Sequence, residues 1–492
     1  MTIYKNIKIR LSENDRIRLY YHKTVKKLLR LNTKRDCVLD RQEIEESLAE
    51  MKKLGSKNGR RILVSGHIGL SPRTPYLAKV NAYLSENYEI FQLIENGVDY
   101  KTLQDKKWDG ISEKEYKMLK QFIVPSLFMK DIFRAYEKVY TDDESRRIVE
   151  QKQYLREAAE NLRKRHFNMR EDYIQYFVIQ SYYYLCKVIE ILHVDCVVLW
   201  NQFFAFHHIF EGICKEKEIK CMYFEFGVIP GTYAVETTGQ MGESYPALEY
   251  RRFRELKVID EDLRKAKEIC QYIKSNRINR KVQPKQDISK ILNKKLKKGV
   301  PTIFFAGQND FESGLCPYTE HTKRYHSPIF QSSDEAVRYL AKLAKKNGWN
   351  LIYKMHPLVS KFCLPSKLPR NVVMLNNANI NDLIEKADLT ITVLSQTGYV
   401  ALFNEKPVLM LGYTQLRGKG CNYEAFELEK VEQEIKTALE NGFTEKQKDN
   451  FIMHVAQITK YYVFDDEWFD KAISYGKTIR DCAELITQYL EK

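Results

Sequence analysis

The chain has 492 residues, of which 44% are hydrophobic, and its mean hydropathy is −0.48. These values describe a globular protein long enough for two domains and argue against a disordered or membrane-spanning chain. The 80 Lys and Arg residues outnumber the 65 Asp and Glu residues, giving a net charge of +15 that favours anionic partners such as nucleic acid, an acidic polymer or a phospholipid surface.

Several patterns that mark particular classes of protein are missing from the sequence. The ten cysteines show no C-x-x-C spacing and no signal peptide is visible, which is typical of reduced thiols in the cytoplasm. The ten histidines form no H-E-x-x-H motif and no mixed cluster with cysteine, so we expect no metal and no other cofactor. No zinc finger or RNP motif accompanies the basic residues, so we expect no nucleic-acid partner.

Residues 1–60 are predicted to form a basic helical segment. Between residues 1 and 35 there are eleven Lys or Arg, against only Glu13 and Asp15. Such a segment is either attracted to the anionic inner face of a cell membrane as a peripheral contact, or is simply a solvated helix face. Both interpretations stay open at this point.

Residues 61–285 are predicted to be an N-terminal α/β domain. Apolar strands alternate with helical patterns, which is typical of a parallel, doubly wound sheet. The longest apolar stretch, at 173–186, is too short to span a bilayer. The expected elements are a strand followed by a glycine-bearing turn within 60–70, strands at 88–94, 195–201 and 220–227, a charged helical section at 143–165, and a polar connection between domains at 275–299.

Residues 295–440 are predicted to be a second α/β domain, followed by helices at 441–492 that return to the first domain. Its longest helix should have Asp334 as N-cap and Gly348 just past its C-terminus. The expected strands occupy 301–307, 350–355, 371–375, 388–395 and 407–412. The sequence therefore predicts two consecutive Rossmann-like α/β domains with a cleft between them.

The residues that follow the predicted strands are the candidates for a site, because ligands of open α/β sheets bind outside the carboxyl ends of the strands. Lys354 and His356 end one strand and face the same side of it, since side chains alternate along a strand. Pro357 keeps His356 in extended geometry. An ammonium beside an imidazole suits a phosphate oxygen, but an exposed lysine and a helix-blocking turn would give the same sequence.

Two further strand ends of the second domain carry polar groups. Ser395 and Thr397 supply hydroxyls at the start of a helix, where backbone N–H groups also favour an anion, although an ordinary N-cap has the same residues. The loop GQNDFES, 307–313, offers Asp310 and Glu312, carboxylates of the kind that sugar chemistry uses as acid, base or nucleophile. A polar loop without chemistry would look the same.

The first domain has its own polar strand ends. Asn201 and Glu225 occupy equivalent places on two neighbouring predicted strands. Gly227 and Gly231 would let the backbone approach a ligand closely, whereas a plain turn is the other interpretation of these glycines.

Taken in this order, these stretches resemble the bacterial capsule-polysaccharide synthesis family of glycosyltransferases, which includes the Kdo transferases that use CMP-Kdo. The resemblance covers roughly residues 195–425 and is carried by VVLWN (197–201), FEFG (224–227), GQNDFES (307–313), YKMHP (353–357) and LSQTGYVALFNEKPVLMLG (394–412). It implies a GT-B fold and a metal-independent transfer. It also implies that the donor nucleotide binds mainly to the C-terminal domain and the acceptor to the N-terminal one.

The resemblance also implies roles for single residues. By its motifs, Lys354 and His356 contact the donor phosphate, and an acidic residue after Gln308 is the catalytic carboxylate. The family's spacing selects Glu312, with Asp310 as the rival. The remaining assignments are Ser395, Gln396, Thr397 and Gly398, with Gln308, in the donor site, Glu225 as a further catalytic candidate, and Asn201, Gly227 and Gly231 at the acceptor side.

Two other functions stay open. One is a CDP-alcohol phosphotransferase of the teichoic-acid polymerase type, whose members also carry a His-Pro turn. The other is a basic α/β protein that binds an anionic polymer without catalysis. The sequence favours the glycosyltransferase, because several polar strand ends in register are hard to obtain by capping alone. It leaves open the donor sugar, the nucleotide, the acceptor, retention or inversion of configuration, and the oligomeric state.

Overall fold

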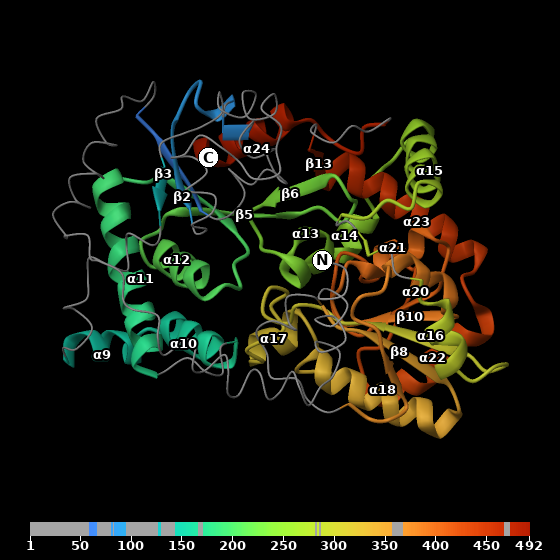
Figure 1. Cartoon of the computed structure of the whole chain (residues 1–492). Coiled ribbons are helices and arrows are strands. Elements are labelled where there is room, and N and C mark those ends of the chain that lie inside the picture. The colour runs from blue at the N-terminus through green and yellow to red at the C-terminus, as the bar shows by residue number, and fades with distance from the viewer. Residues whose placement is uncertain are drawn as a thin grey trace, which may run out of the picture. The chain divides into compact units, whose positions relative to one another are not determined.

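The computed structural model describes residues 59–65, 80–81, 83–94, 126–128, 143–165, 171–280, 283–284, 287–356, 368–466 and 473–492. The chain divides into two compact units, each with its own sheet (Figure 1). The N-terminal unit comprises the described residues among 35–163, 169–240 and 459–492. The C-terminal unit comprises those among 164–168 and 241–458. The predicted basic segment 1–60 lies outside the described residues except for its last two.

A seven-stranded sheet forms the centre of the N-terminal unit, in the order β13-β6-β5-β4-β1-β2-β3. The five strands from β5 to β3 in this order run parallel, whereas β6 pairs antiparallel with β5 and the edge strand β13 pairs antiparallel with β6. The strands are β1 (Arg61–Ser65), β2 (Glu89–Ile94), β3 (Ser126–Phe128), β4 (Cys196–Trp200), β5 (Lys220–Phe226), β6 (Thr232–Glu236) and β13 (Val463–Asp465).

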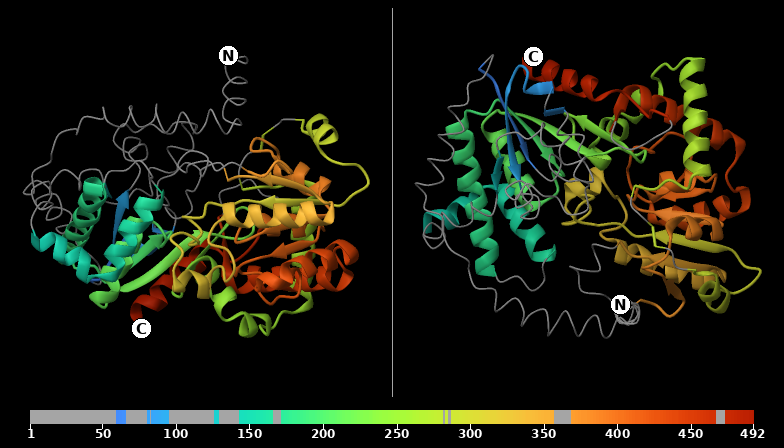
Figure 2. Two further views of the ribbon diagram at one scale, coloured as in Figure 1. Left: turned by 90° about the horizontal axis from the view of Figure 1, so that it is seen from below. Right: turned by 45° about the horizontal axis from the view of Figure 1, so that its top comes forward.

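Both faces of this sheet are covered, because its strands alternate between two apolar clusters. Leu63 and Val197 pack against the helices that follow β3 and β4, whereas Ile62 and Val198 pack against the last helix of the chain. Figure 2 shows that last helix, in red, beside the blue strands. The helices are α9 (Asp143–Gln151), α10 (Gln153–Arg165), α11 (Glu171–Leu192), α12 (Ala205–Glu216) and α24 (Ile479–Glu491).

The C-terminal unit contains a six-stranded sheet in which all strands are parallel, in the order β12-β11-β10-β7-β8-β9. Counted along the chain, this is the order 6-5-4-1-2-3 of a Rossmann-type sheet, whose strand order reverses between β7 and β10. The strands are β7 (Thr302–Ala306), β8 (Asn350–Lys354), β9 (Val372–Met374), β10 (Leu389–Thr392), β11 (Val408–Met410) and β12 (Tyr423–Glu424).

Helices cover both faces of the second sheet as well. Ile303 and Leu351 face α18 and α22, and Val408 and Met410 face α21. The helical elements are η3 (Met241–Glu243), α13 (Tyr245–Leu248), α14 (Tyr250–Arg254), α15 (Asp260–Ser275), α16 (Ser289–Lys295), α17 (Glu320–Tyr325), α18 (Ser333–Asn347), α20 (Ile380–Lys386), α21 (Thr397–Phe403), η4 (Leu428–Lys430), α22 (Val431–Asn441) and α23 (Glu445–Gln457). The π-helical turn η5 (Ile458–Tyr462) then leads the chain into the N-terminal unit.

The prediction of two Rossmann-like α/β domains, as in GT-B proteins, is confirmed. The chain passes between the compact units after residues 240 and 458, whereas the sequence analysis placed the boundaries at 285–295 and 440. The physical reason is packing. Helix α15 contacts α21 and α23, which places it with the second sheet, and the chain after 458 adds β13 and α24 to the first.

The longest helix of the C-terminal unit corrects one predicted cap. The hydroxyl of Ser332 accepts a hydrogen bond from the Glu335 N–H, so Ser332 is the N-cap of α18, and the prediction of Asp334 was wrong. Asp334 lies in the first turn, where a negative charge complements the helix dipole. Gly348 ends the helix with φ of 75°, as predicted.

No helix within the described parts of the chain is both long and apolar enough to cross a bilayer.

Candidate active site

The reversal point of the C-terminal sheet is bridged by one buried side chain, Gln308. Its Oε1 accepts a hydrogen bond of 2.6 Å from the backbone N–H of Leu394, at the end of β10, and its Nε2 donates to the hydroxyl of Ser313 at 3.2 Å. The preceding residue, Gly307, donates its N–H to the carbonyl of Lys354 at 2.9 Å. The carboxyl ends of β7, β8 and β10 are therefore tied together at the place where open α/β sheets bind ligands.

Asp310, in the loop after β7, uses its carboxylate to hydrogen-bond the start of a helix. One carboxylate oxygen accepts the backbone N–H of Ser333 at 2.9 Å and the other accepts its hydroxyl at 2.6 Å, at the start of α18. Burial raises the pKa of the Asp310 carboxyl to about 6, against the opposing effect of these two hydrogen bonds. Both oxygens have structural partners, which favours a positioning role.

Glu312, two residues further on, has a different environment. Its side chain is 26% exposed and forms an ion pair of 3.3 Å with Arg165, which groups with the same compact unit. Its backbone N–H donates to the carbonyl of Asn309 at 3.1 Å, which fixes the turn that carries it. A carboxylate that is partly exposed and beside a guanidinium is accessible to a substrate in a way that Asp310 is not.

Lys354, the last residue of β8, directs its ammonium at the chain that follows β9. It donates to the carbonyls of Asn376 and Ala378, both at 2.9 Å. Burial lowers the pKa of this ammonium to about 8. An ammonium has three N–H donors, so two of the three are used to hold this turn. His356 is half-buried two residues after the end of β8, and Pro357 lies outside the described residues.

Helix α21 begins at Thr397 with Gln396 as its N-cap and no side-chain cap, so neither Ser395 nor Thr397 is the N-cap that the sequence offered as an alternative. The Ser395 hydroxyl accepts the backbone N–H of Thr397 at 3.2 Å and donates its own proton to the Thr397 hydroxyl oxygen at 3.0 Å. Ser395, Gln396 and Thr397 are half-buried, whereas Gly398 is buried. A Cβ on Gly398 would lie 3.3 Å from the Met410 sulfur, so this glycine lets α21 pack closely on β11.

Asn201 and Glu225 of the N-terminal unit are neighbours, as predicted, because β4 and β5 pair in register at Trp200 and Phe224. Asn201 has φ of 52°, a left-handed conformation that asparagine tolerates. Its carbonyl accepts a hydrogen bond of 3.2 Å from Nδ1 of His207. Since Nδ1 then carries the proton, Nε2 of His207 accepts a hydrogen bond of 3.0 Å from the hydroxyl of Ser65. The side chains of His207 and Ser65 are fully buried.

Glu225 shares a hydroxyl with a second carboxylate. The Tyr462 O–H lies 3.1 Å from Glu225 and also within hydrogen-bond distance of Glu236. Burial, followed by the charges of the two carboxylates, raises the pKa of this phenol well above its ordinary range. Because one O–H donates to one acceptor at a time, the two glutamates compete for the same proton.

Gly227 and Gly231 shape the turn between β5 and β6. A Cβ on Gly227 would lie 2.1 Å from the Thr232 hydroxyl oxygen, and Gly231 has φ of 82°. These positions require glycine for the turn itself, which agrees with the plain-turn interpretation of the sequence.

The structure adds groups that the sequence analysis missed. Arg165 joins Glu312 although it lies far away in the chain. Glu243, His321 and His326 also come together, with one ligand atom of each within 4.8 Å of the others. Neither group forms a recognisable motif in the sequence. The members of each group come from separate segments, and metal-ligand spacing can be recognised in a sequence only when the ligands lie close together in the chain.

Residues 259–459 match the model of the family described as capsule polysaccharide biosynthesis protein. The predicted family resemblance is confirmed for this region, which makes up most of the C-terminal unit. No curated protein matches the chain.

Several solved structures are similar to the chain at low identity. The beta Kdo 2,7 transferase of KpsC from Thermosulfurimonas dismutans is 17% identical, with a TM-score of 0.36, over 63% of this chain and 89% of its own. The beta Kdo 2,4 transferase of the same organism's KpsC is also 17% identical, with a TM-score of 0.37, over 53% and 79%. The S. aureus MnaA structure with UDP is 11% identical, with a TM-score of 0.35, over 88% and 96%.

Proposed function

We propose that this chain, whose residues 259–459 form a capsule polysaccharide biosynthesis region, is a glycosyltransferase that moves a sugar from a nucleotide donor to a capsular or other surface-polysaccharide acceptor. The observation that carries the proposal is the hydrogen bond between Gln308 and Leu394, which holds the loops after β7 and β10 together at the reversal point of the sheet. By the family resemblance, the sugar is Kdo, the donor is CMP-Kdo, and the transfer is metal-independent.

The proposed donor site uses His356 and the hydroxyls at the start of α21 for the donor phosphate. Because Ser395 gives its proton to the Thr397 oxygen, the Thr397 O–H points its own proton to a further acceptor, such as a phosphate oxygen. His356, just past the end of β8 and two strands away from β10 in the sheet, has a half-buried imidazole that suits the same anion. Lys354 supports this edge by holding the turn after β9, and its third N–H remains for the ligand.

We assign the catalytic step to Glu312. In the proposed step, Glu312 takes the proton of the acceptor hydroxyl as that oxygen attacks the anomeric carbon, and the bond from this carbon to the donor phosphate breaks so that the nucleotide leaves as an anion. Partial exposure favours Glu312 for this task, and the ion pair with Arg165 orients its carboxylate. Asp310 then acts as a positioning residue that fixes the loop on α18. This choice agrees with the spacing of the family motif.

The acceptor is proposed to bind on the N-terminal unit near Asn201 and Glu225. The basic residues between 1 and 35 would add a peripheral contact with an anionic membrane, where a lipid-linked acceptor would be found. On this proposal the protein works in the cytoplasm, at the inner face of the membrane. Its partners are then a nucleotide sugar and a lipid-linked or oligosaccharide acceptor.

The first experiment measures protection against thermal unfolding by CMP-, UDP-, GDP- and CDP-linked donors, and the mass of any product formed with an oligosaccharide acceptor. We expect protection by a CMP-linked sugar and an acceptor that gains one glycosyl unit. A gained phosphodiester would instead identify a CDP-alcohol phosphotransferase. If the chain bound an anionic polymer and no nucleotide protected it against thermal unfolding, it would be a polymer-binding protein and not an enzyme.

The second experiment tests the donor site with His356→Ala. A hydrogen bond to a charged group is worth about 1.5–3 kcal/mol, so we expect the donor affinity to fall by about 10- to 100-fold with the fold retained. His208→Ala is the matched control, because His208 is a half-buried histidine of the other unit that pairs with Glu157. Unchanged donor affinity in His356→Ala would remove the proposed phosphate contact.

A further inference from the structure

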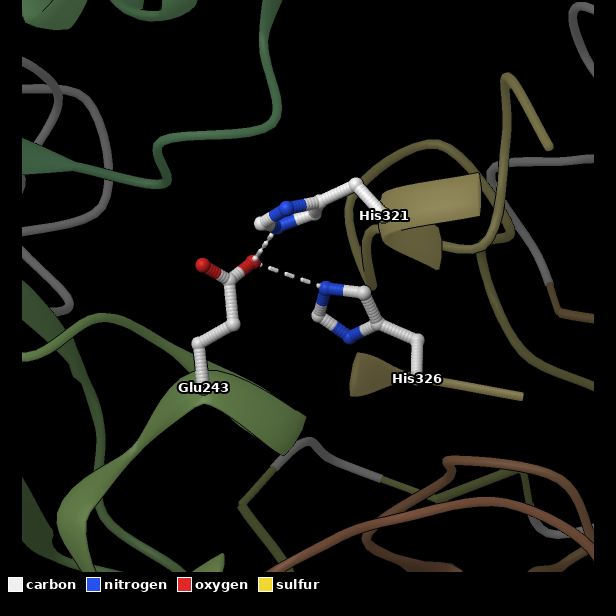
Figure 3. A group of neighbouring side chains, drawn as sticks. All are labelled: Glu243, His321 and His326. Atoms are coloured by element: carbon white, nitrogen blue, oxygen red, sulfur yellow. Dashed lines mark hydrogen bonds and ion pairs between the residues drawn. The ribbon is translucent and has the colours of Figure 1, made fainter. Parts of the chain in front are cut away.

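Three side chains of the C-terminal unit direct metal-binding atoms at one point (Figure 3). Nε2 of His321 lies 3.0 Å and Nε2 of His326 lies 2.9 Å from the same carboxylate oxygen, Oε1 of Glu243. Glu243 ends η3, His321 lies in the first turn of α17, and His326 directly follows the last residue of α17. Two imidazoles and one carboxylate are therefore gathered from two separate segments.

Backbone hydrogen bonds fix the segment that carries both histidines, and η3 packs closely against it. The carbonyl of His326 accepts the N–H of Tyr413 at 2.6 Å, and the His326 N–H donates to Thr322 of α17 at 2.8 Å. A Cβ on Gly242 would lie 1.9 Å from the carbonyl oxygen of Tyr325, so only glycine lets η3 come this close to α17. The site is therefore built into the packing and does not depend on chance contacts of long side chains.

The three residues differ in exposure in a way that suits entry of an ion. The side chain of His326 is 1% exposed and that of Glu243 13%, whereas His321 is 57% exposed. Two ligands thus lie in the interior, and the third lies on the surface side.

We propose that Glu243, His321 and His326 bind a divalent transition-metal ion of the zinc type. Imidazole nitrogen selects this class of ion over magnesium and calcium, which prefer oxygen ligands. Ligand atoms about 2.0–2.1 Å from a tetrahedral zinc lie roughly 3.3–3.4 Å apart, so the spacings of 2.9 and 3.0 Å between each Nε2 and the Glu243 oxygen need to open by a few tenths of an ångström. The two nitrogens lie within 4.8 Å of each other, and a bound ion would set their spacing to the same value. Three protein ligands leave the fourth position to water or to an anionic oxygen.

The site lies at the carboxyl edge of the second sheet. A Cβ on Gly412, which follows β11, would lie 2.7 Å from the carbonyl of His326 and 3.0 Å from that of Val393, just past β10. A bound ion would therefore fix the chain after α17 against the ends of two strands. The proposal goes beyond the transferase activity and does not depend on it, because no step of the transfer has been assigned to the ion.

Metal binding can be measured directly on the full chain. After removal of any affinity tag, the protein is titrated with Zn²⁺ against a colorimetric chelator, and with Co²⁺, whose visible absorption reports tetrahedral coordination. We expect one ion per chain. His321→Ala and Glu243→Gln should each weaken zinc binding by at least about 100-fold, more than the loss of an outer-shell partner causes. His321 is exposed, so its replacement should leave the fold intact.

His208→Ala is the matched control for metal binding. His208 has carboxylates of Glu157 and Glu211 at 2.8 and 3.9 Å but no second histidine, so its replacement should leave zinc affinity unchanged. The proposal is wrong if the protein does not bind zinc at micromolar concentration, or if wild type and His321→Ala bind zinc with equal affinity. The three residues would then be a hydrogen-bonded cluster only. Since the readout is metal affinity, this outcome is independent of whether the chain transfers a sugar.

Discussion

The two sheets reverse their strand order at comparable places and use the polar residues there differently. In the N-terminal unit, Ser65 and His207 lie at the reversal between β1 and β4, where they are fully buried and hydrogen-bond to each other. In the C-terminal unit, Glu312 and Thr397 lie at the reversal between β7 and β10 and are half-buried. Equal topology therefore does not mean equal availability to a ligand.

The difference teaches how to interpret polar residues at strand ends. Gln308, Asp310 and Lys354 also lie at the edge of the second sheet, yet each gives most of its hydrogen-bonding capacity to the backbone or side chains of its own unit. Next to them, Glu312 and His356 keep partial exposure. The edge is thus made of two kinds of residue: those that fix the loops and those that remain accessible.

The largest effect is expected at Glu312. Glu312→Gln keeps the size of the side chain but removes the proposed base, so turnover should fall by about 10²- to 10⁴-fold with unchanged stability. Asp310→Asn should retain far more turnover. The measurement is the initial rate of glycosyl transfer at saturating donor. If Asp310→Asn were the more damaging change, the two roles would have to be exchanged.

At Asp310 we expect an effect of pH on the stability of the fold. The folded-state pKa of about 6 lies above the ordinary value of 3.8, so the folded chain binds the proton more tightly than the unfolded chain does. This group therefore lowers the free energy of unfolding as the pH rises from about 4 to about 6, by up to roughly 3 kcal/mol, since one pKa unit corresponds to about 1.4 kcal/mol.

The test compares urea unfolding of wild type and Asp310→Asn between pH 4 and pH 7. The difference between the two curves should change across this range and be flat above it. A difference that does not vary with pH would mean that Asp310 is not buried in the way described.

The next effect concerns the bridge across the reversal point. Gln308→Met fills the same space but leaves the N–H of Leu394 without its acceptor, which should cost about 1–3 kcal/mol of unfolding free energy. Gln433→Met on the exposed side of α22 is the control and should change stability by less than about 0.5 kcal/mol. Equal stability of both variants in chemical denaturation would show that the bridge is not needed.

The smallest effect is expected in the N-terminal unit. Tyr462→Phe removes the hydroxyl that Glu225 and Glu236 share, and should lower the unfolding free energy by about 1–2 kcal/mol. Donor affinity should stay the same, because the donor is assigned to the other unit. Tyr461→Phe, at the exposed neighbouring position, controls for loss of a phenol. A large loss of donor affinity in Tyr462→Phe alone would contradict the division of roles.

The sequence by itself determined the elements and the order in which they occur. Continuous apolar runs such as CVVLW and TIFFA predicted buried parallel strands, and these are β4 and β7. Gly348 predicted the end of α18, because a helix often ends at a residue in the left-handed conformation, which glycine adopts most easily. These features depend on a few neighbouring residues, and for that reason they can be found in the sequence.

Only the tertiary structure decided which polar residues are accessible and which distant ones meet. The sequence offered Asp310 and Glu312 as equals, and their difference arises from Ser333 and Arg165, which lie elsewhere in the chain. The same holds for Glu243, whose oxygen meets two histidines that follow β7. Burial and hydrogen bonding depend on segments brought together by folding of the whole unit, and no local pattern encodes them.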